Sequence, residues 1–228
     1  MKLELLGDPG AEELLVFFVG WGMDARPFEA LVPEGLRVAL LFDYRHPELP
    51  PLPRARRIKV LAWSLGVRMA LECLAQISAE AALLVAGTGA FAHPRWGIDP
   101  RLVRLTLEGL KREGEGVRTR FFERMFAQRQ ECERFFKGRP ARQLPEVIEE
   151  LERALTLPPL FPRNLPRKIP MMALIPEKDR IFPPQAQQRF WTAEGIPFIF
   201  LDRGHFPFYA LRDLREFWRT YTHDMFKP

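Results

Sequence analysis

The segment LAWSLGVRMA, residues 61–70, places a single serine between an apolar run and a stretch with helical character. Ala62 lies two residues before Ser64, and Gly66 lies two residues after it. A nucleophile elbow requires small residues at these positions, because its sharp turn brings strand and helix close together. Ser64 is therefore a candidate nucleophile for acyl transfer; its alternative role is an N-cap that opens a core helix.

A serine hydroxyl needs a base that removes its proton, and His205 is the best placed of the four histidines. It lies in DRGHFPF, directly after the last apolar run, which predicts a position at the same sheet edge as Ser64. His46 and His93 each precede a proline in loop-like segments, and His223 lies near the C-terminus. The alternative for His205 is an ordinary histidine on a surface loop.

The imidazole in turn needs a carboxylate that fixes its tautomer and stabilises its cation. Asp179, in IPEKDRIFPP, follows another apolar run and is the candidate acid, with Glu177 and Asp202 as competitors. The order along the chain, Ser64, Asp179, His205, is that of the α/β-hydrolases. Three residues that each follow their own strand in this order indicate a serine hydrolase more specifically than any one of them.

The oxyanion of a tetrahedral intermediate needs hydrogen-bond donors. The backbone N–H of Leu65, just after the candidate nucleophile, is the first. The second is the N–H of Trp21 in the loop VGWGMD, where Gly20 and Gly22 let the backbone approach a ligand closely. The indoles of Trp21 and Trp63 could also wall an acyl chain, although core packing is the alternative for both.

Apolar runs alternate with helical patterns toward both ends of the chain. Helical spacing is found in residues 23–32, 64–77, 183–195 and 208–221. The apolar runs are typical of strands buried on both faces of a parallel sheet, and they span residues 14–19, 37–42, 58–63, 81–87, 170–176 and 196–202. Residues 1–87 and 169–228 are therefore expected to form an α/β-hydrolase core, with a mostly parallel sheet flanked by helices.

Residues 88–168 interrupt this core and carry no strand pattern. Their helical periodicity covers residues 101–112, 117–129, 130–137 and 145–155, which predicts an inserted helical lid. The basic character of the chain is concentrated here, with 17 Lys and Arg against 11 Asp and Glu between residues 88 and 170. Such a surface attracts acidic partners, although a solvated helical surface is the alternative.

Composition argues against several classes of protein. No apolar stretch approaches the roughly 18–20 residues of a membrane span, and the N-terminal segment lacks the apolar region of a secretory signal. Cys73 and Cys132 are far apart and fit reduced thiols, which predicts a cytoplasmic protein. The His and Cys residues lack metal-ligand spacing, and no nucleic-acid reading motif is present, so neither a metal, a cofactor nor a nucleic-acid partner is expected.

A series of segments occurs in an order that resembles a known family. They are FVGWGMD, LLFDYRHPEL, LAWSLGVRMA, AGTGA, RWGIDP, EKDRIFPPQAQQRFW and RGHFPF. Together they resemble the BioG-type pimeloyl-[acyl-carrier protein] methyl ester esterases of biotin synthesis, over roughly residues 14–210. The resemblance implies that nucleophile, acid and base fall on Ser64, Asp179 and His205, and that the reaction removes the methyl ester of a carrier-bound acyl chain without a cofactor.

The resemblance also implies that the insertion covers the acyl chain and meets an acidic acyl carrier protein. We expect Phe122 and Phe126 to join Trp21 and Trp63 in binding the substrate. Candidate residues for docking the carrier protein are Arg118, Arg120, Arg124, Arg129 and Lys137. The competing functions are a general carboxylesterase, an acyl thioesterase, and a non-catalytic module that binds acyl carrier protein.

Overall fold

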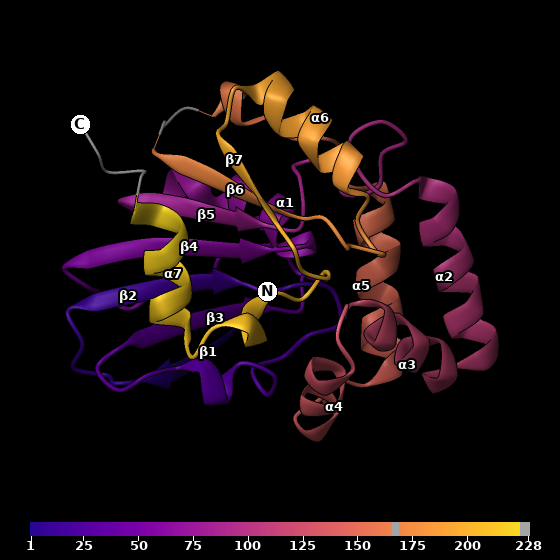
Figure 1. The fold of residues 1–228 in the computed structure, drawn as a ribbon, viewed down its shortest axis with the longest axis horizontal. Coiled ribbons are helices and arrows are strands. Elements are labelled where there is room, and N and C mark those ends of the chain that lie inside the picture. Colours follow the sequence, from indigo (N-terminus) through magenta and orange to yellow (C-terminus); the bar gives the residue numbers. More distant parts are fainter. Residues whose placement is uncertain (166–168, 224–228) are drawn as a thin grey trace.

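Residues 1–165 and 169–223 are described by a computed structural model, in which they form a seven-stranded sheet with helices on both faces (Figure 1). The order across the sheet is β1-β3-β2-β4-β5-β6-β7. Only β1 and β3 pair antiparallel, which confirms the predicted mostly parallel sheet. The strands are β1 (Lys2–Gly7), β2 (Glu13–Phe18), β3 (Arg37–Phe42), β4 (Arg57–Trp63), β5 (Ala81–Val85), β6 (Met171–Pro176) and β7 (Phe198–Leu201).

Alternate side chains of the central strands enter two separate cores. On β2, Val16 and Phe18 join the cluster that packs under α1 (Leu65–Cys73) and α6 (Pro184–Glu194). Leu15 and Phe17 join the opposite cluster, under α7 (Leu214–Thr222), which crosses the front of the sheet in Figure 1. Burial on both faces explains why these strands appear in the sequence as continuous apolar runs.

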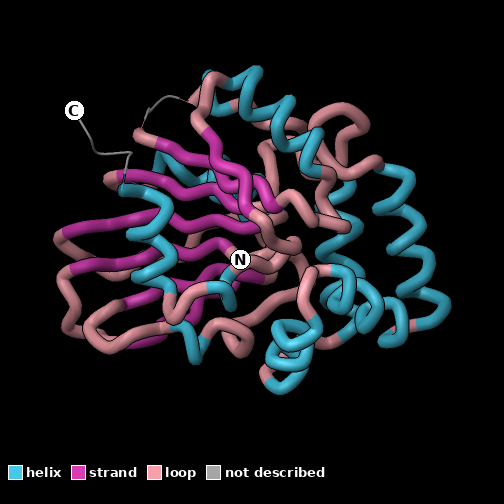
Figure 2. Tube along the Cα trace, in the orientation of Figure 1, coloured by secondary structure: helices cyan, strands magenta, loops and turns pink. Residues whose placement is uncertain are grey.

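Four helices follow one another between β5 and β6. They are α2 (Pro100–Glu113), α3 (Glu115–Arg124), α4 (Arg129–Lys137) and α5 (Leu144–Thr156). They stand together beyond the carboxyl ends of the parallel strands (Figures 1 and 2). That residues 88–168 act as a lid stays a prediction. Residues 166–168 of this predicted lid and residues 224–228 of the predicted core lie outside the described residues.

Two segments differ from the sequence-based expectation. Strand β1 was not expected, because an exposed edge strand that pairs with one neighbour needs no continuous apolar run. Residues 23–32 form only the short 3₁₀ turn Glu29–Leu31 instead of a helix. Pro27 has no backbone N–H to donate, and Phe28 is buried directly against the sheet.

The insertion is tied to the sheet edge by a buried carboxylate. Asp43, directly after β3, lies 2.7 Å from Arg45 Nε, 2.9 Å from Lys2 Nζ and 2.9 Å from Arg142 Nη2, just ahead of α5. Burial alone raises the pKa of Asp43, but hydrogen bonds from Arg45 and Lys2 and the charge of Arg142 outweigh it and hold this pKa well below its ordinary value. The ionised form of Asp43 is therefore part of the folded structure.

Replacement of this carboxylate, Asp43→Asn, should lower the free energy of unfolding at pH 7 by about 1–3 kcal/mol, because three cations lose a charged acceptor. A carboxyl whose pKa is depressed in the fold contributes stability that is present above about pH 4 and is lost as the pH falls below it. The wild type should therefore lose more stability than the variant between pH 4 and more acidic solutions. Urea unfolding at each pH measures both effects.

Glu12→Gln is the control, since Glu12 and its partner Arg56 are both about three-quarters exposed. An exposed pair of this kind contributes at most about 1 kcal/mol. If Asp43→Asn and the wild type lost stability with the same acid dependence, the proposed ionised state of Asp43 would be wrong.

Candidate active site

Ser64 occupies a strained turn between β4 and α1. Its backbone has φ 58° and ψ −123°, and its side chain makes no capping hydrogen bond to α1, which argues against the N-cap role. A Cβ added to Gly66 would lie 2.2 Å from the carbonyl oxygen of Phe18, and one added to Gly87 would lie 2.5 Å from that of Ser64. The turn therefore closes only because these neighbours lack side chains.

The structure brings Ser64, His205 and Asp179 together in one chain of hydrogen bonds. His205 Nε2 lies 2.9 Å from Ser64 Oγ, and His205 Nδ1 lies 2.7 Å from Asp179 Oδ2. All three side chains are buried. Of the competing acids, Glu177 is exposed, and Asp202 is exposed and pairs with Lys178. This is the geometry in which an imidazole can take a proton from a serine hydroxyl.

The carboxylate of Asp179 is held by further hydrogen bonds. Asp179 Oδ1 accepts hydrogen bonds from the backbone N–H groups of Ile181 and Phe182, each at 2.8 Å. Gln187, fully buried on α6, donates to Asp179 Oδ2 at 3.3 Å. These contacts orient the carboxylate. Sequence reasoning missed Gln187, because a glutamine within a helical pattern carries no signal that it faces the site.

The loop after β2 runs beside the serine. A Cβ added to Gly20 would lie 3.2 Å from Ser64 Cβ and 2.8 Å from the ring of Trp63. Within residues 1–165 and 169–223, the backbone N–H groups of Trp21 and Leu65 have no protein acceptor. Their role as oxyanion donors stays a prediction, and unpaired N–H groups beside a nucleophile are what that role requires.

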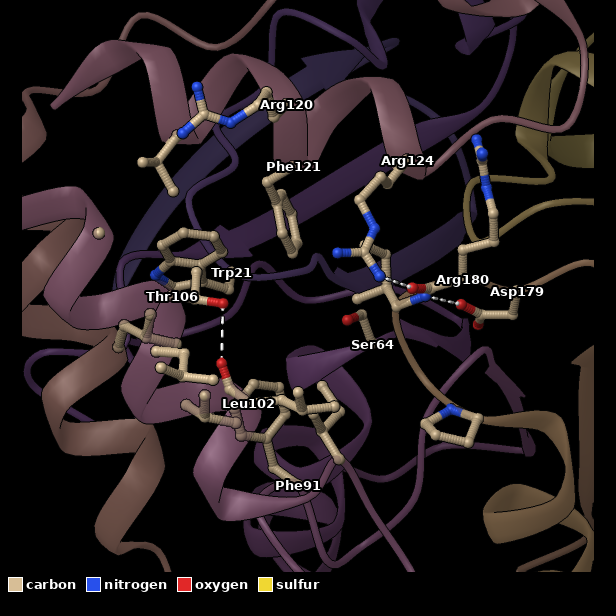
Figure 3. Close-up of a pocket in the computed structure, with 18 of the residues that line it drawn as sticks. Trp21, Ser64, Phe91, Leu102, Thr106, Arg120, Phe121, Arg124, Asp179 and Arg180 are labelled. Carbon is tan, nitrogen blue, oxygen red and sulfur yellow. Dashed lines mark hydrogen bonds between the residues drawn. The ribbon is translucent and has the colours of Figure 1, made fainter. Parts of the chain in front are cut away.

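A cavity of about 600 Å³ opens above Ser64 (Figure 3). Figure 3 shows Trp21, Phe91, Leu102 and Phe121 around the serine. Such a volume suits a ligand the size of a medium-length acyl chain. Further apolar lining comes from Ile98, Val103, Leu105, Val117, Leu151 and Ile181, and arginines stand among the lining residues at positions 112, 120, 124 and 180.

The expected aromatic lining is partly wrong. Phe122 and Phe126 are buried against Phe135 rather than in the cavity, with ring centroids 5.2 Å from it in each case. Trp63 is also buried in the core, and its Nε1 donates to the carbonyl oxygen of His205 at 2.7 Å. Phe121 lines the cavity instead, because α3 directs the adjacent side chain, Phe122, into the buried core and leaves Phe121 at the cavity.

The expected docking residues fall into three groups. Arg118 is not available to a partner, since it is buried and its guanidinium donates to the carbonyl oxygen of Arg142 and to the carboxylate of Glu115. Arg120 and Arg124 lie at the cavity, where they are exposed. The remaining two, Arg129 and Lys137, are exposed at the two ends of α4. Sequence reasoning missed Arg112 and Arg180, which also line the cavity.

The described residues offer neither a metal site nor a membrane-spanning helix. Across the described ranges, no cluster of three or more His, Cys, Asp or Glu side chains could hold a metal ion. No helix in the same part of the chain combines the length and apolar character needed to cross a membrane.

Comparison with solved structures places the fold. The crystal structure of BioG from Haemophilus influenzae superposes with a TM-score of 0.80 at 27% identity, covering 96% of this chain and 100% of that one. An esterase from Exiguobacterium antarcticum superposes with a TM-score of 0.71 at 16% identity, covering 99% of this chain and 95% of that one. With the sheet order above, these similarities show an α/β-hydrolase fold.

Comparison of sequences gives the family. The chain is 31% identical over 192 residues to a malonyl-[acyl-carrier protein] O-methyltransferase of Bacteroides fragilis, covering 80% of this chain but only 37% of that longer protein. An uncharacterised protein of Haemophilus influenzae is 29% identical over 81% of this chain and 85% of its own length. The model of the pimeloyl-ACP methyl esterase BioG family matches residues 1–214. The chain therefore belongs to the BioG family and has the α/β-hydrolase fold.

Proposed function

We propose that this protein hydrolyses the methyl ester of a pimeloyl chain carried by acyl carrier protein, with Ser64 as nucleophile. The observation that supports the proposal most directly is the hydrogen-bonded series Ser64, His205, Asp179 beside a largely apolar cavity. Membership of the BioG family supports the substrate class.

The reaction proceeds in two acyl-transfer steps. His205 Nε2 takes the proton from Ser64 as Oγ attacks the ester carbonyl, and Asp179 stabilises the imidazolium. The N–H groups of Trp21 and Leu65 stabilise the oxyanion. His205 then returns the proton to the departing methoxide, and methanol leaves. Water, deprotonated by His205, attacks the acyl-enzyme and releases the free carboxylic acid and Ser64.

The lining of the cavity offers groups that suit the two parts of this substrate. Its apolar side chains suit the hydrocarbon chain and the uncharged ester. The arginines that line the cavity suit an acidic carrier protein and the phosphate of its prosthetic arm. The name of the Bacteroides fragilis relative, malonyl-[acyl-carrier protein] O-methyltransferase, describes the addition of a methyl group to a carrier-bound acid. The reaction proposed here removes such a group.

Ser64→Ala should lower the turnover of methyl-pimeloyl-[acyl-carrier protein] by roughly 10⁴–10⁶-fold, because the nucleophile is lost while binding is retained. Mass spectrometry of the carrier protein after incubation detects the loss of the methyl group. The assay also measures free thiol, which an acyl thioesterase would release in place of methanol.

Ser78→Ala is the matched control, since Ser78 is exposed and is the only other serine of the sequence. It should keep full activity and full labelling by a fluorophosphonate, whereas Ser64→Ala should lose both. Retention of most activity by a folded Ser64→Ala variant would contradict the mechanism.

The double variant Arg120→Glu, Arg124→Glu should raise KM for the carrier-bound ester by about tenfold and flatten its dependence on salt, because charge complementarity chiefly speeds encounter. Hydrolysis of a small p-nitrophenyl ester should change less than twofold, since it needs no carrier protein. Steady-state kinetics at two ionic strengths measures both quantities.

Arg56→Glu serves as the control, because Arg56 is exposed beside the start of β4, at the opposite edge of the sheet. It makes the same kind of charge change away from the cavity. Because Arg56→Glu changes the net charge by half as much, a rise in KM of about threefold for this variant would show that only net charge matters and would refute docking at Arg120 and Arg124.

A further inference from the structure

One buried carboxylate of the insertion has no part in the mechanism above. Glu150 lies on α5, and its side chain is fully buried. Its Oε1 accepts from the backbone N–H of Tyr44 at 2.8 Å, and its Oε2 accepts from the backbone N–H of Gly22 at 3.0 Å. Arg142 Nη1 lies 2.6 Å from the same Oε2. A buried carboxylate is costly, and these three donors offset part of that cost, although burial still raises the pKa of Glu150 above its ordinary value.

The same helix also holds the residue before Gly22. The carbonyl oxygen of Val147, one turn earlier on α5, accepts a hydrogen bond from Trp21 Nε1 at 2.8 Å. A Cβ added to Gly22 would lie 3.3 Å from Val147 Cγ1, and the φ of Gly22 is +72°. Helix α5 therefore accepts hydrogen bonds from both the indole of Trp21 and the peptide N–H that follows it.

Tyr44 holds the start of the loop that carries Trp21. The hydroxyl of Tyr44 shares its one proton between the carbonyl oxygens of Val19 and Leu41, which lie 2.8 and 2.9 Å away. The backbone N–H of Tyr44 is the second donor to Glu150. Glu150 thus joins the loops that follow β2 and β3, and it does so from an element inserted more than a hundred residues later.

These contacts determine how the Trp21 N–H points. Before Trp21, Gly20 packs closely against Ser64 and Trp63. After Trp21, the N–H of Gly22 donates to Glu150, so the chain is held on both sides of Trp21. With its side chain also bonded, Trp21 keeps little freedom to rotate its own N–H. Donors to an oxyanion are effective only when they are held in place before the charge develops.

We propose that Glu150 is a positioning residue that holds the loop of Gly20, Trp21 and Gly22 in the geometry that stabilises the oxyanion. The helical insertion then contributes to the chemical step as well as to substrate binding. This inference rests on the proposed esterase function, and its test uses the whole 228-residue chain with a p-nitrophenyl ester, so that carrier-protein binding plays no part.

Glu150→Gln is the decisive variant. Gly22, Tyr44 and Arg142 all present donors to this side chain, so an amide must point its own donor group at one of them. Loss of one oxyanion donor lowers kcat by roughly 10²–10³-fold, and a displaced donor should cost about 10–100-fold. We expect this fall in kcat with KM changed less than twofold. Glu150→Asp keeps the charge and should recover part of the loss.

A second measurement separates positioning from simple destabilisation. An alkyl trifluoromethyl ketone forms an adduct with Ser64 that carries an oxyanion, so its inhibition constant should rise by about the same factor by which kcat/KM falls. Ala154→Gly is the matched control, since Ala154 is buried one turn later on α5 and a glycine there weakens the helix. It should lower the melting temperature and leave kcat and inhibitor affinity unchanged.

The outcomes are distinguishable. A folded Glu150→Gln variant with kcat within twofold of the wild type would overturn the inference, as would an equal loss of kcat in Ala154→Gly. If Glu150→Gln did not fold, Glu150→Asp would decide by the same two measurements, with an unchanged kcat counting against the role. A wild type that hydrolyses no ester, and matches Ser64→Ala, would instead overturn the proposed function together with this inference.

Discussion

The two hydrogen bonds that join Ser64 to His205 and His205 to Asp179 require three loops from distant parts of the chain to meet at one sheet edge. Parallel strands satisfy this requirement, because all their carboxyl ends lie on the same side. β7 is nevertheless an edge strand, three positions from β4, so the loop that carries His205 must fold back across β6 and β5. Trp63 anchors the returning loop by donating to the carbonyl oxygen of His205. A side chain expected to contact substrate is thus a support for the base.

Buried carboxylates organise this edge in a common way. Asp179 accepts two backbone N–H groups of its own loop, and Glu150 accepts one from each of two other loops. Hydrogen bonds offset part of the cost of burying each carboxylate, and each thereby holds loops that have no regular secondary structure. Asp43 extends the arrangement by linking β1 and β3 to the insertion through Lys2 and Arg142. Buried carboxylates therefore hold together the loops around the site.

The cavity owes its shape to the way the inserted helices pack on one another. Leu102, Leu105, Thr106 and Gly109 lie three or four residues apart on α2 and present one face to it. Gly109 lets α2 approach α3, since a Cβ there would lie 3.3 Å from Val117. Leu102 and Leu105 stay largely exposed, so this wall is apolar although water reaches it. An acyl chain that entered would cover surface left uncovered by the fold.

The sequence by itself determined the parallel strands of the sheet, the inserted helices and the small residues around Ser64, because continuous apolar runs, helical periodicity and steric limits at a turn are local properties. It also indicated which side chains follow which strand, and hence the sheet edge to which Ser64, Asp179 and His205 belong. Only the tertiary structure decided that Phe121 rather than Phe122 faces the cavity, that Arg118 is buried, and that β1 completes the sheet. The role of Glu150 was equally invisible, since a glutamate in an amphipathic helix looks like any solvated residue. Each of these depends on which distant surface an element packs against, and long-range packing of that kind leaves no local pattern in the sequence.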